Sequence, residues 1–244
     1  MDKKINKIKE KLIRTERFLF KTHNCVCCGR ECDLENKYRI CSHCLETLDF
    51  TGEHFCLTCG DKIDNNYDYC LKCKNDLYNF DKARNIFIYN DLIKTAIMNF
   101  KYNGKPEYAE PLGNLLKDYY ADSDIIADVV TYVPMPKDRE KKRGYNQAKE
   151  LAKQFSYLTE MPIEDLLERV ESVEKQSVLT AKERRENIKG TISAINKHKI
   201  KNKDILIIDD VLTTGATASE CAKILKQNGA KSVSVLTLAK TNLN

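Results

Sequence analysis

Short apolar runs alternate with helix-like patterns along the chain after residue 80. The spacing of apolar positions predicts strands over 83–89, 127–133, 205–208 and 232–238. It predicts helices over 91–100, 106–120 and 144–158, and a further helix that begins after Thr217 and ends near Gly229. Strands that alternate with helices indicate a doubly wound α/β domain, with a mostly parallel sheet and flanking helices, over residues 81–244.

The N-terminal pattern is different, because apolar residues recur at helical spacing among many lysines. Residues 3–22 are predicted to form an amphipathic helix, and residues 1–22 are assigned to it as a separate segment. No apolar stretch approaches the roughly 18 residues that a membrane span needs, and no signal-peptide core is present. The sequence therefore predicts a soluble, cytoplasmic protein. The net charge of +5 is too small to indicate nucleic-acid binding by itself.

One of the predicted strands leads directly into a phosphate-binding pattern. Residues 205–217 read ILIIDDVLTTGAT: four apolar residues, two acidic residues that are predicted to close the strand, and a Thr/Gly-rich turn. A strand, a small-residue loop and a helix N-terminus direct backbone N–H groups and the helix dipole toward an anion. Because Asp209 and Asp210 stand before this cradle, we expect a ligand with hydroxyls beside its phosphate, such as a ribose 5-phosphate. The alternative is a buried strand that ends in a solvated Asp-Asp turn.

The cysteines are concentrated in one region. Ten of the eleven lie between Cys25 and Cys73, and they include four C-x-x-C pairs separated by 12, 11 and 10 residues. A C-x-x-C knuckle turns two thiolates toward one metal ion, and two knuckles complete a tetrahedral zinc site. The spacing predicts a double zinc-ribbon module over residues 23–80. It would hold two structural Zn²⁺ ions through Cys25, Cys28, Cys41, Cys44, Cys56, Cys59, Cys70 and Cys73. Disulfides are the alternative, but they are rare in cytosolic proteins.

The spacing leaves the pairing of the knuckles open. Sequential pairing joins the first knuckle with the second and the third with the fourth, whereas cross-braced pairing joins the first with the third and the second with the fourth. Cys27 and Cys32 are not among the paired cysteines, so one of them would replace a neighbouring ligand or both would be free thiols. Cys221 is predicted to pack on the core face of its helix as a small apolar residue.

Two further segments carry charge suited to an anionic ligand. Residues 133–147 leave a strand, turn through two prolines and become basic before a helix. They would lie at the carboxyl edge of the sheet, where ligands of open α/β folds bind. Residues 176–190 contain a capping-box pattern and two arginines, Arg184 and Arg185, and would form a mobile lid that excludes water from a reactive sugar centre. The alternatives are a solvated basic loop and a plain surface helix.

The run 205–217 resembles the phosphoribosyl-pyrophosphate (PRPP) binding motif of type I phosphoribosyltransferases. The resemblance implies that Asp209 and Asp210 hold the ribose 2- and 3-hydroxyls close to a Mg²⁺ ion. It implies that the 5-phosphate is wrapped by a loop of Thr213, Thr214, Gly215, Ala216 and Thr217. In this family a loop after a strand holds the pyrophosphate. Here Arg143 with Lys141 or Lys142 would face that anion, and Gly144 would permit close backbone approach.

The order of the motifs is similar to that of the ComF family, which are bacterial competence-associated proteins with an N-terminal zinc module and a phosphoribosyltransferase domain. The knuckle pairs are followed by FKYxG at 100–104, RGYNQ at 143–147, QxxLxxxxRRxNxxG at 176–190 and the PRPP motif. The resemblance covers the chain from about Cys25 onward. Departures from the family pattern are Cys27, Cys32 and Thr191.

The resemblance implies a phosphoribosyltransferase that binds PRPP with Mg²⁺ and acts in natural transformation, with single-stranded DNA and the DNA-uptake machinery as partners. Catalysis would rest mainly on charge stabilisation and positioning, since no general base is evident. The residues assigned to the transfer are Asp209, Asp210, Arg143 and Arg184. The alternative is a non-catalytic module that binds single-stranded DNA or regulates, and that keeps the PRPP fold as a sensor or docking platform. No motif identifies the acceptor, for which Lys101 and Tyr102 are candidate contacts.

Overall fold

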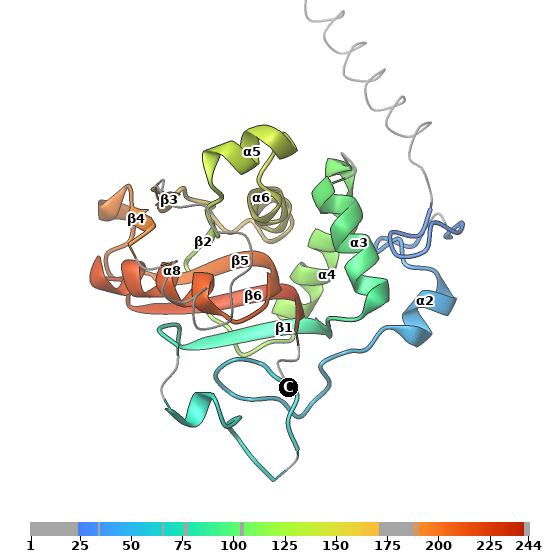
Figure 1. Ribbon diagram of the computed structural model, residues 1–244, viewed down its shortest axis with the longest axis horizontal. Coiled ribbons are helices and arrows are strands. Elements are labelled where there is room, and N and C mark those ends of the chain that lie inside the picture. Colours follow the sequence, from blue (N-terminus) through green and yellow to red (C-terminus); the bar gives the residue numbers. More distant parts are fainter. Residues whose placement is uncertain are drawn as a thin grey trace, which may run out of the picture.

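The computed structural model describes residues 24–33, 35–64, 66–75, 78–102, 105–170, 188 and 190–241. The helix predicted over residues 3–22 lies outside this part of the chain, as does most of the predicted lid, including Arg184 and Arg185. A parallel sheet with flanking helices makes up the larger part of what is described (Figure 1). Two cysteine clusters precede it in the sequence.

The central sheet is built from β1 (Lys82–Ile88), β2 (Val129–Tyr132), β5 (Asp204–Leu212) and β6 (Ser232–Lys240). All neighbours are parallel, in the order β1-β6-β5-β2. The apolar side chains of β5 and β6 are buried on both faces of the sheet, as the unbroken apolar run at the start of β5 predicts. The four predicted strands are thus confirmed, with one correction. Because Leu212 stays paired with Lys240 of β6, the acidic pair does not close β5, which continues beyond it.

The longer helices of the described residues are α3 (Asp91–Tyr102), α4 (Ala109–Ala121), α6 (Gln147–Thr159) and α8 (Ala216–Gln227). α4 and α6 pack against each other and against the sheet, so they share one of its faces (Figure 1). After α6, Ile163 makes a parallel bridge to Val130 of β2, so the connection from β2 through α6 leads away from β5. The connection from β5 through α8 leads to β6 and thus in the opposite direction along the sheet. Because such crossovers are right-handed, α8 lies on the face opposite to α6.

The basic segment after β2 contains a helix rather than only a loop. α5 (Lys137–Arg143) ends at Gly144, whose φ of 90° is easily adopted by a residue without Cβ. α6 begins at Gln147, where the Asn146 side chain accepts hydrogen bonds from two N–H groups of the first turn. The helix predicted from residue 144 therefore begins later than expected, because the turn at Gly144 and the cap at Asn146 separate two helices.

A small antiparallel sheet, which the apolar pattern did not predict, consists of β3 (Leu167–Arg169) and β4 (Ile192–Ala194). β4 packs against α8, which brings Arg169 toward that helix. The remaining described elements are one short helix, α2 (Ser42–Thr47), and three 3-10 turns at Cys73–Asn75, Pro106–Tyr108 and Lys197–Lys199.

The cysteine-rich segment, residues 24–80, covers the outer edge of β1. The N–H of Ala83 donates to the carbonyl of Thr58 at 2.6 Å, and the N–H of Ile88 donates to the carbonyl of Asp49 at 2.7 Å. Exposed edge strands present unpaired backbone groups that promote association with other chains. The cysteine-rich segment therefore protects the edge of the sheet.

Asn85 of β1 fastens the third cysteine knuckle to the sheet. Its Nδ2 group donates to the carbonyls of Cys59 at 3.0 Å and Gly60 at 3.2 Å, while its Oδ1 accepts from Oγ1 of Thr237 at 2.8 Å. Gly60 has a φ of 67°, and a Cβ at this position would lie 2.4 Å from Asn85 Nδ2. The close approach of the knuckle to β1 therefore requires glycine at this position.

Candidate functional site

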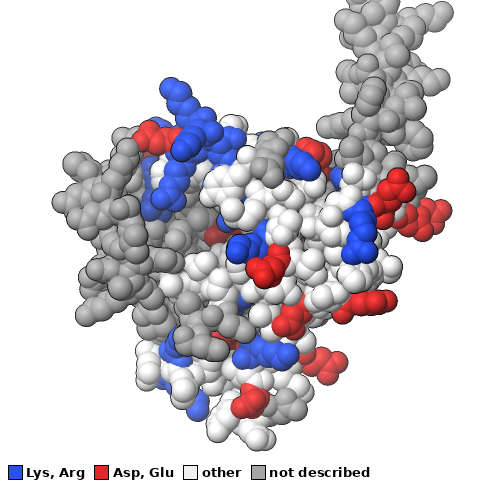
Figure 2. Space-filling view, turned by 45° about the vertical axis from the view of Figure 1, so that its right-hand side comes forward, with Lys and Arg blue, Asp and Glu red and all other residues white. Residues whose placement is uncertain are grey.

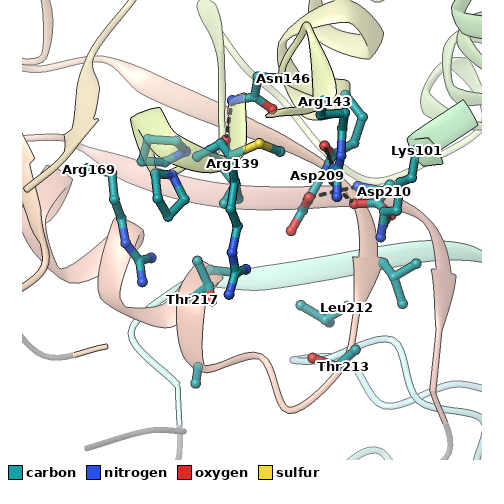
Figure 3. Close-up of a pocket in the computed structure, with 18 of the residues that line it drawn as sticks. Lys101, Arg139, Arg143, Asn146, Arg169, Asp209, Asp210, Leu212, Thr213 and Thr217 are labelled. Carbon is teal, nitrogen blue, oxygen red and sulfur yellow. Dashed lines mark hydrogen bonds and ion pairs between the residues drawn. The ribbon is translucent and has the colours of Figure 1, made fainter. Parts of the chain in front are cut away.

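A cavity of about 340 Å³ opens at the carboxyl end of the sheet, the edge at which ligands of such folds bind. The ends of β2 and β5, the C-terminus of α3, α5 and the N-terminus of α8 surround it (Figure 3). Its charged lining residues are Lys101, Arg139, Arg143, Arg169, Asp209 and Asp210. Four cationic side chains thus share the cavity with two carboxyl groups, so the cavity suits an anion.

Asp209 and Asp210 lie side by side in β5 but have different surroundings. Asp210 is almost fully buried and forms an ion pair with Lys101, while Gln147 Nε2 donates to Asp210 Oδ1 at 3.2 Å. Asp209 is half-buried, and its Oδ1 accepts the N–H of Asp210 at 2.9 Å. Helices α3 and α6 therefore each supply one polar side chain that holds Asp210.

The pKa values of the two carboxyls move in opposite directions. Burial and the neighbouring charge of Asp210 raise the pKa of Asp209 well above its ordinary value. Burial would raise the pKa of Asp210 too, but the charge and hydrogen bond of Lys101 outweigh this and hold it below its ordinary value. Burial lowers the pKa of Lys101, but the attraction of Asp210 exceeds that effect and the pKa is raised. Asp210 is therefore held as a carboxylate, whereas Asp209 would ionise when a cation binds beside it.

The loop 213–217 joins β5 to α8 beside the acidic pair. Gly215 has a φ of 73° and forms the N-cap of α8, and its carbonyl accepts the N–H of Ser219 at 2.8 Å. The Thr214 side chain is buried, and its Oγ1 accepts the N–H of Ala216 at 3.4 Å. The loop residues that line the cavity are Thr213, Gly215, Ala216 and Thr217. The first N–H groups of a 12-residue helix therefore border the cavity, an arrangement that binds anions.

The predicted pyrophosphate segment places two arginines, Arg139 and Arg143, at the cavity and its lysines on the surface. Arg143 lines the cavity, donates to Gln147 and lies over the Tyr102 ring, 4.8 Å from its centroid. Lys141 and Lys142 are exposed on α5 and are not among the residues that line the cavity. In Figure 2, Lys and Arg side chains gather at the top of the molecule, at the height of α5 in Figure 1.

Two arginines of the cavity were missed by reasoning from the sequence, Arg139 of α5 and Arg169 at the end of β3. Figure 3 shows both side chains reaching toward the region of Thr217. Burial lowers the pKa of Arg169, and the charge of Arg139 lowers it further, so the two cations lie close enough to repel. Arg139 belongs to a basic run that a sequence pattern flags. Arg169 belongs to a three-residue strand that carries no such signal.

Both cysteine clusters match the geometry of a zinc site. The thiol sulfurs lie within 4.8 Å of one another in two groups, Cys25, Cys28, Cys41 and Cys44, and Cys56, Cys59, Cys70 and Cys73. The Sγ–Sγ distance is 3.6 Å between Cys28 and Cys41, and 3.7 Å between Cys59 and Cys70. A tetrahedral site with Zn–S bonds of about 2.3 Å requires about 3.8 Å. Each cluster could therefore hold one Zn²⁺, and the knuckles pair sequentially rather than in the cross-braced way.

The other cysteines belong to neither cluster. Cys27 and Cys32 are not among the thiols that gather in the two groups of four, which supports the alternative in which both are free thiols. Cys221 is buried on α8, as predicted, and burial raises its pKa.

Residues 141–242 match the family model described as Phosphoribosyl transferase domain. Competence protein ComFC of Streptococcus pneumoniae is 31% identical over 210 residues, which cover 82% of this chain and 87% of that protein. Competence protein F of Haemophilus influenzae is 29% identical over 213 residues, 84% of this chain and 91% of that protein. DNA utilization protein YhgH of Escherichia coli is 26% identical over 208 residues, 83% of this chain and 90% of that protein. None of the helices in the described ranges is both long and apolar enough to cross a membrane.

Proposed function

The chain belongs to the ComF family and has a type I phosphoribosyltransferase fold preceded by a zinc-ribbon module, and from this premise we propose that it binds PRPP with Mg²⁺ and transfers the phosphoribosyl group to an acceptor. The observation that carries the proposal is the loop 213–217 beside the acidic pair in a cationic cavity. PRPP has the complementary chemistry, because it combines a 5-phosphate, two ribose hydroxyls and a pyrophosphate.

We assign the 5-phosphate to the loop 213–217. The N–H groups at the start of α8 and the hydroxyls of Thr213 and Thr217 would donate to it, and the helix dipole favours its charge. Gly215 lets the backbone approach the anion, since no Cβ stands in the way. Thr214 would contribute through its backbone, because its side chain is buried.

We assign the ribose hydroxyls to Asp209 and Asp210. Carboxylate oxygens are ligands that Mg²⁺ prefers, and this ion usually keeps several waters. Asp210 is already neutralised by Lys101, so Asp209 is the carboxyl better suited to the ion or to a water in its shell. When bound with PRPP, Mg²⁺ supplies neutralising charge at the pyrophosphate.

We assign the pyrophosphate to the cationic side of the cavity. Negative charge grows on the pyrophosphate as it leaves, so Arg143, Arg139 and Arg169 would stabilise the transition state more than the ground state. Further contributions from Lys141 or Lys142, Gly144 and Arg184 stay predictions. Positioning and charge stabilisation would carry the reaction, since cationic side chains and the start of α8 line the cavity.

Calorimetric titration with PRPP in the presence of Mg²⁺ tests the proposal. We expect wild-type protein to bind, and Asp209→Asn to weaken binding by about 10- to 100-fold, because a charged contact to the ligand is lost. Asp204→Asn is the matched control, since Asp204 lies on the same strand at the opposite end, paired with Lys231. Absence of PRPP binding by wild-type protein at millimolar ligand would refute the proposal. A screen of bases, amines and single-stranded DNA for pyrophosphate release would identify the acceptor.

The exposed basic residues of α5 favour a second candidate function, in which the protein binds single-stranded DNA during DNA uptake. Lys137, Lys141 and Lys142 are exposed on this helix, and the relatives carry the names of competence and DNA utilization proteins. Such a surface binds the phosphate backbone with strong salt dependence. DNA binding that survives Asp209→Asn, falls with Lys141→Ala plus Lys142→Ala, and occurs without pyrophosphate release would establish a non-catalytic module.

A further inference from the structure

The loop 213–217 is held from outside the cavity by residues that follow the second cysteine cluster. Tyr78 Oη donates to the carbonyl of Thr214 at 3.2 Å. The ring lies so close to Gly215 that a Cβ there would be 2.5 Å from Tyr78 Cε1. It also stacks on Phe80, with centroids 4.7 Å apart and planes at 15°. Tyr78 is not among the residues that line the cavity, so this contact leaves the loop accessible to a ligand.

Asn79 holds the turn that follows the loop. Its backbone N–H and its Nδ2 group both donate to Oγ of Ser219 at 2.9 Å. Ser219 is buried in the first turn of α8. The next residues are fixed in turn, since Phe80 is buried and the carboxylate of Asp81 accepts the N–H of Val233 at 2.7 Å. One short segment thus contacts both the loop and the helix that begins from it.

We propose that Tyr78, Asn79 and Phe80 form a strap that positions the phosphate loop, and that the second cysteine cluster controls the affinity of the loop for its phosphate ligand through this strap. The inference rests on the proposed function, in which that ligand is the 5-phosphate of PRPP. A cradle of backbone N–H groups binds tightly only when its dihedral angles are fixed before the ligand arrives, because ordering the loop otherwise costs binding free energy. Tyr78 and Asn79 are positioning residues and do not touch the ligand.

The second cluster is attached to the part of the sheet next to the strap. Asn85 of β1 binds the carbonyls of Cys59 and Gly60, and Lys240 of β6 pairs with Asp61 at 3.6 Å. The four thiols of this cluster fit one Zn²⁺, which would fix the knuckles and with them the contacts that Asn85 and Lys240 make.

The first cluster is attached elsewhere. Tyr38 Oη donates to the carboxylate of Asp118 on α4 at 2.5 Å, and Lys37 pairs with the same carboxylate at 2.6 Å. These contacts of the first cluster run to α4 and not to the loop 213–217 or the strap. The two clusters therefore form a matched pair for an experiment.

Variants of Tyr78 test the strap directly. We expect Tyr78→Phe, which keeps the ring but loses the hydrogen bond, to weaken PRPP binding about fivefold, and Tyr78→Ala to weaken it at least about tenfold. Tyr69→Ala is the control, because Tyr69 is exposed on the same module. Amide hydrogen exchange gives a readout without ligand: residues 213–219 should exchange faster in Tyr78→Ala, with the strands β5 and β6 unchanged. Faster exchange across the whole sheet would point to general destabilisation and overturn the strap.

Substitution of one cysteine in each cluster tests whether the second cluster controls the affinity of the loop for its phosphate ligand. Cys41 and Cys70 are both half-buried ligands of their clusters, and each serine variant should lose one Zn²⁺, measured by elemental analysis. We expect only Cys70→Ser to weaken PRPP binding by about tenfold or more and to speed exchange at 213–219. Equal PRPP affinity of the two variants would overturn the proposal. If wild-type protein does not bind PRPP, the proposed function fails, whereas unchanged exchange at 213–219 in both Tyr78 variants refutes the strap alone.

Discussion

Lys101 governs the charge of the candidate site because it is paired with Asp210. The exposed fractions of the two side chains are 20% and 4%, so neither charge is well hydrated. Removing one partner of such a pair leaves the other buried without compensation. The sequence suggests Lys101 only as a contact for the acceptor. Its pairing with Asp210 depends on where α3 ends relative to β5, which no local pattern encodes.

Replacing Lys101 by methionine should destabilise the fold. We expect Lys101→Met to lower the free energy of unfolding by roughly 3 kcal/mol at pH 7, because Asp210 is left as an unpaired buried carboxylate. Urea denaturation gives the value. Lys94→Met is the control on the same helix, since Lys94 is exposed and pairs with an exposed Asp91 at 3.7 Å; it should cost less than about 0.5 kcal/mol. Similar losses in the two variants would contradict the assigned role of Lys101.

The elements differ in how far the sequence predicts them. The strands β1, β2, β5 and β6 follow from short segments rich in apolar and β-branched residues, the clearest of which is the unbroken run 205–208 in β5. The end of β5 is predicted too early, because the acidic pair suggests a turn whereas these residues stay paired with β6. α5 is a seven-residue helix without a buried side chain, and so it has no apolar periodicity to reveal it. β3 and β4 are too short to leave a pattern.

The contact between the third knuckle and β1 is sensitive to a single methyl group. We expect Gly60→Ala to lower the free energy of unfolding by about 2–4 kcal/mol, because its Cβ would lie 2.4 Å from Asn85 Nδ2 and 2.7 Å from the carbonyl oxygen of Ala83. Gly29→Ala is the matched control. Gly29 has a similar φ of 77° in the first knuckle but open space around it, so the cost should be the backbone strain of about 1 kcal/mol. Equal costs in urea denaturation would show that packing against β1 is unimportant.

The ion pair that ties β1 to the segment after α4 should give a pH-dependent stability. Asp124 accepts from Arg84 and Lys82 at 2.8 Å, and although burial opposes this, their hydrogen bonds and charges lower its pKa from 3.8 to about 2. The folded state therefore favours the carboxylate. Its contribution is complete above the unfolded value near 4 and is lost as the pH falls through about 2.

The variant Asp124→Asn measures that contribution. Because the Asp124 side chain is 53% exposed and screened by solvent, we expect a loss of only about 1 kcal/mol at pH 7. The gap in urea midpoint between wild type and variant should narrow at pH 3. Comparing the two proteins at each pH cancels effects that they share, such as release of zinc in acid. A gap that widens in acid would mean that Asp124 does not carry the effect.

At the scale of the whole molecule, the candidate site is assembled from elements far apart in the sequence. Asp209, Asp210 and the loop 213–217 are predictable because they are contiguous and have a motif. Lys101, Gln147 and Arg169 come from α3, α6 and β3, and only the packing of these elements brings them to one cavity. The cysteines of the two candidate metal clusters are predictable from spacing, but their sequential grouping is visible only in space.

Removal of zinc should change the association state of the protein. The cysteine-rich segment covers the edge of β1 and has little core apart from its cysteines, so we expect its fold to depend on bound metal. We expect a zinc chelator to expose that edge and to produce concentration-dependent oligomers, detected by light scattering after size exclusion, and added Zn²⁺ to reverse early association. If complete removal of the metal does not change the oligomeric state, the cysteine-rich segment does not protect the edge of β1 from association.

The strand order also has a consequence for synthesis on the ribosome. β1 lies between two partners: backbone of the cysteine-rich segment, which is translated before it, and β6, which is translated after every other strand of the sheet. A nascent chain therefore carries β1 through most of its synthesis with one side open, and the sheet cannot close until β6 enters between β1 and β5. If the cysteine-rich segment binds zinc early in synthesis, it would cover one edge of β1, and the growing chain would expose only the edge that later pairs with β6.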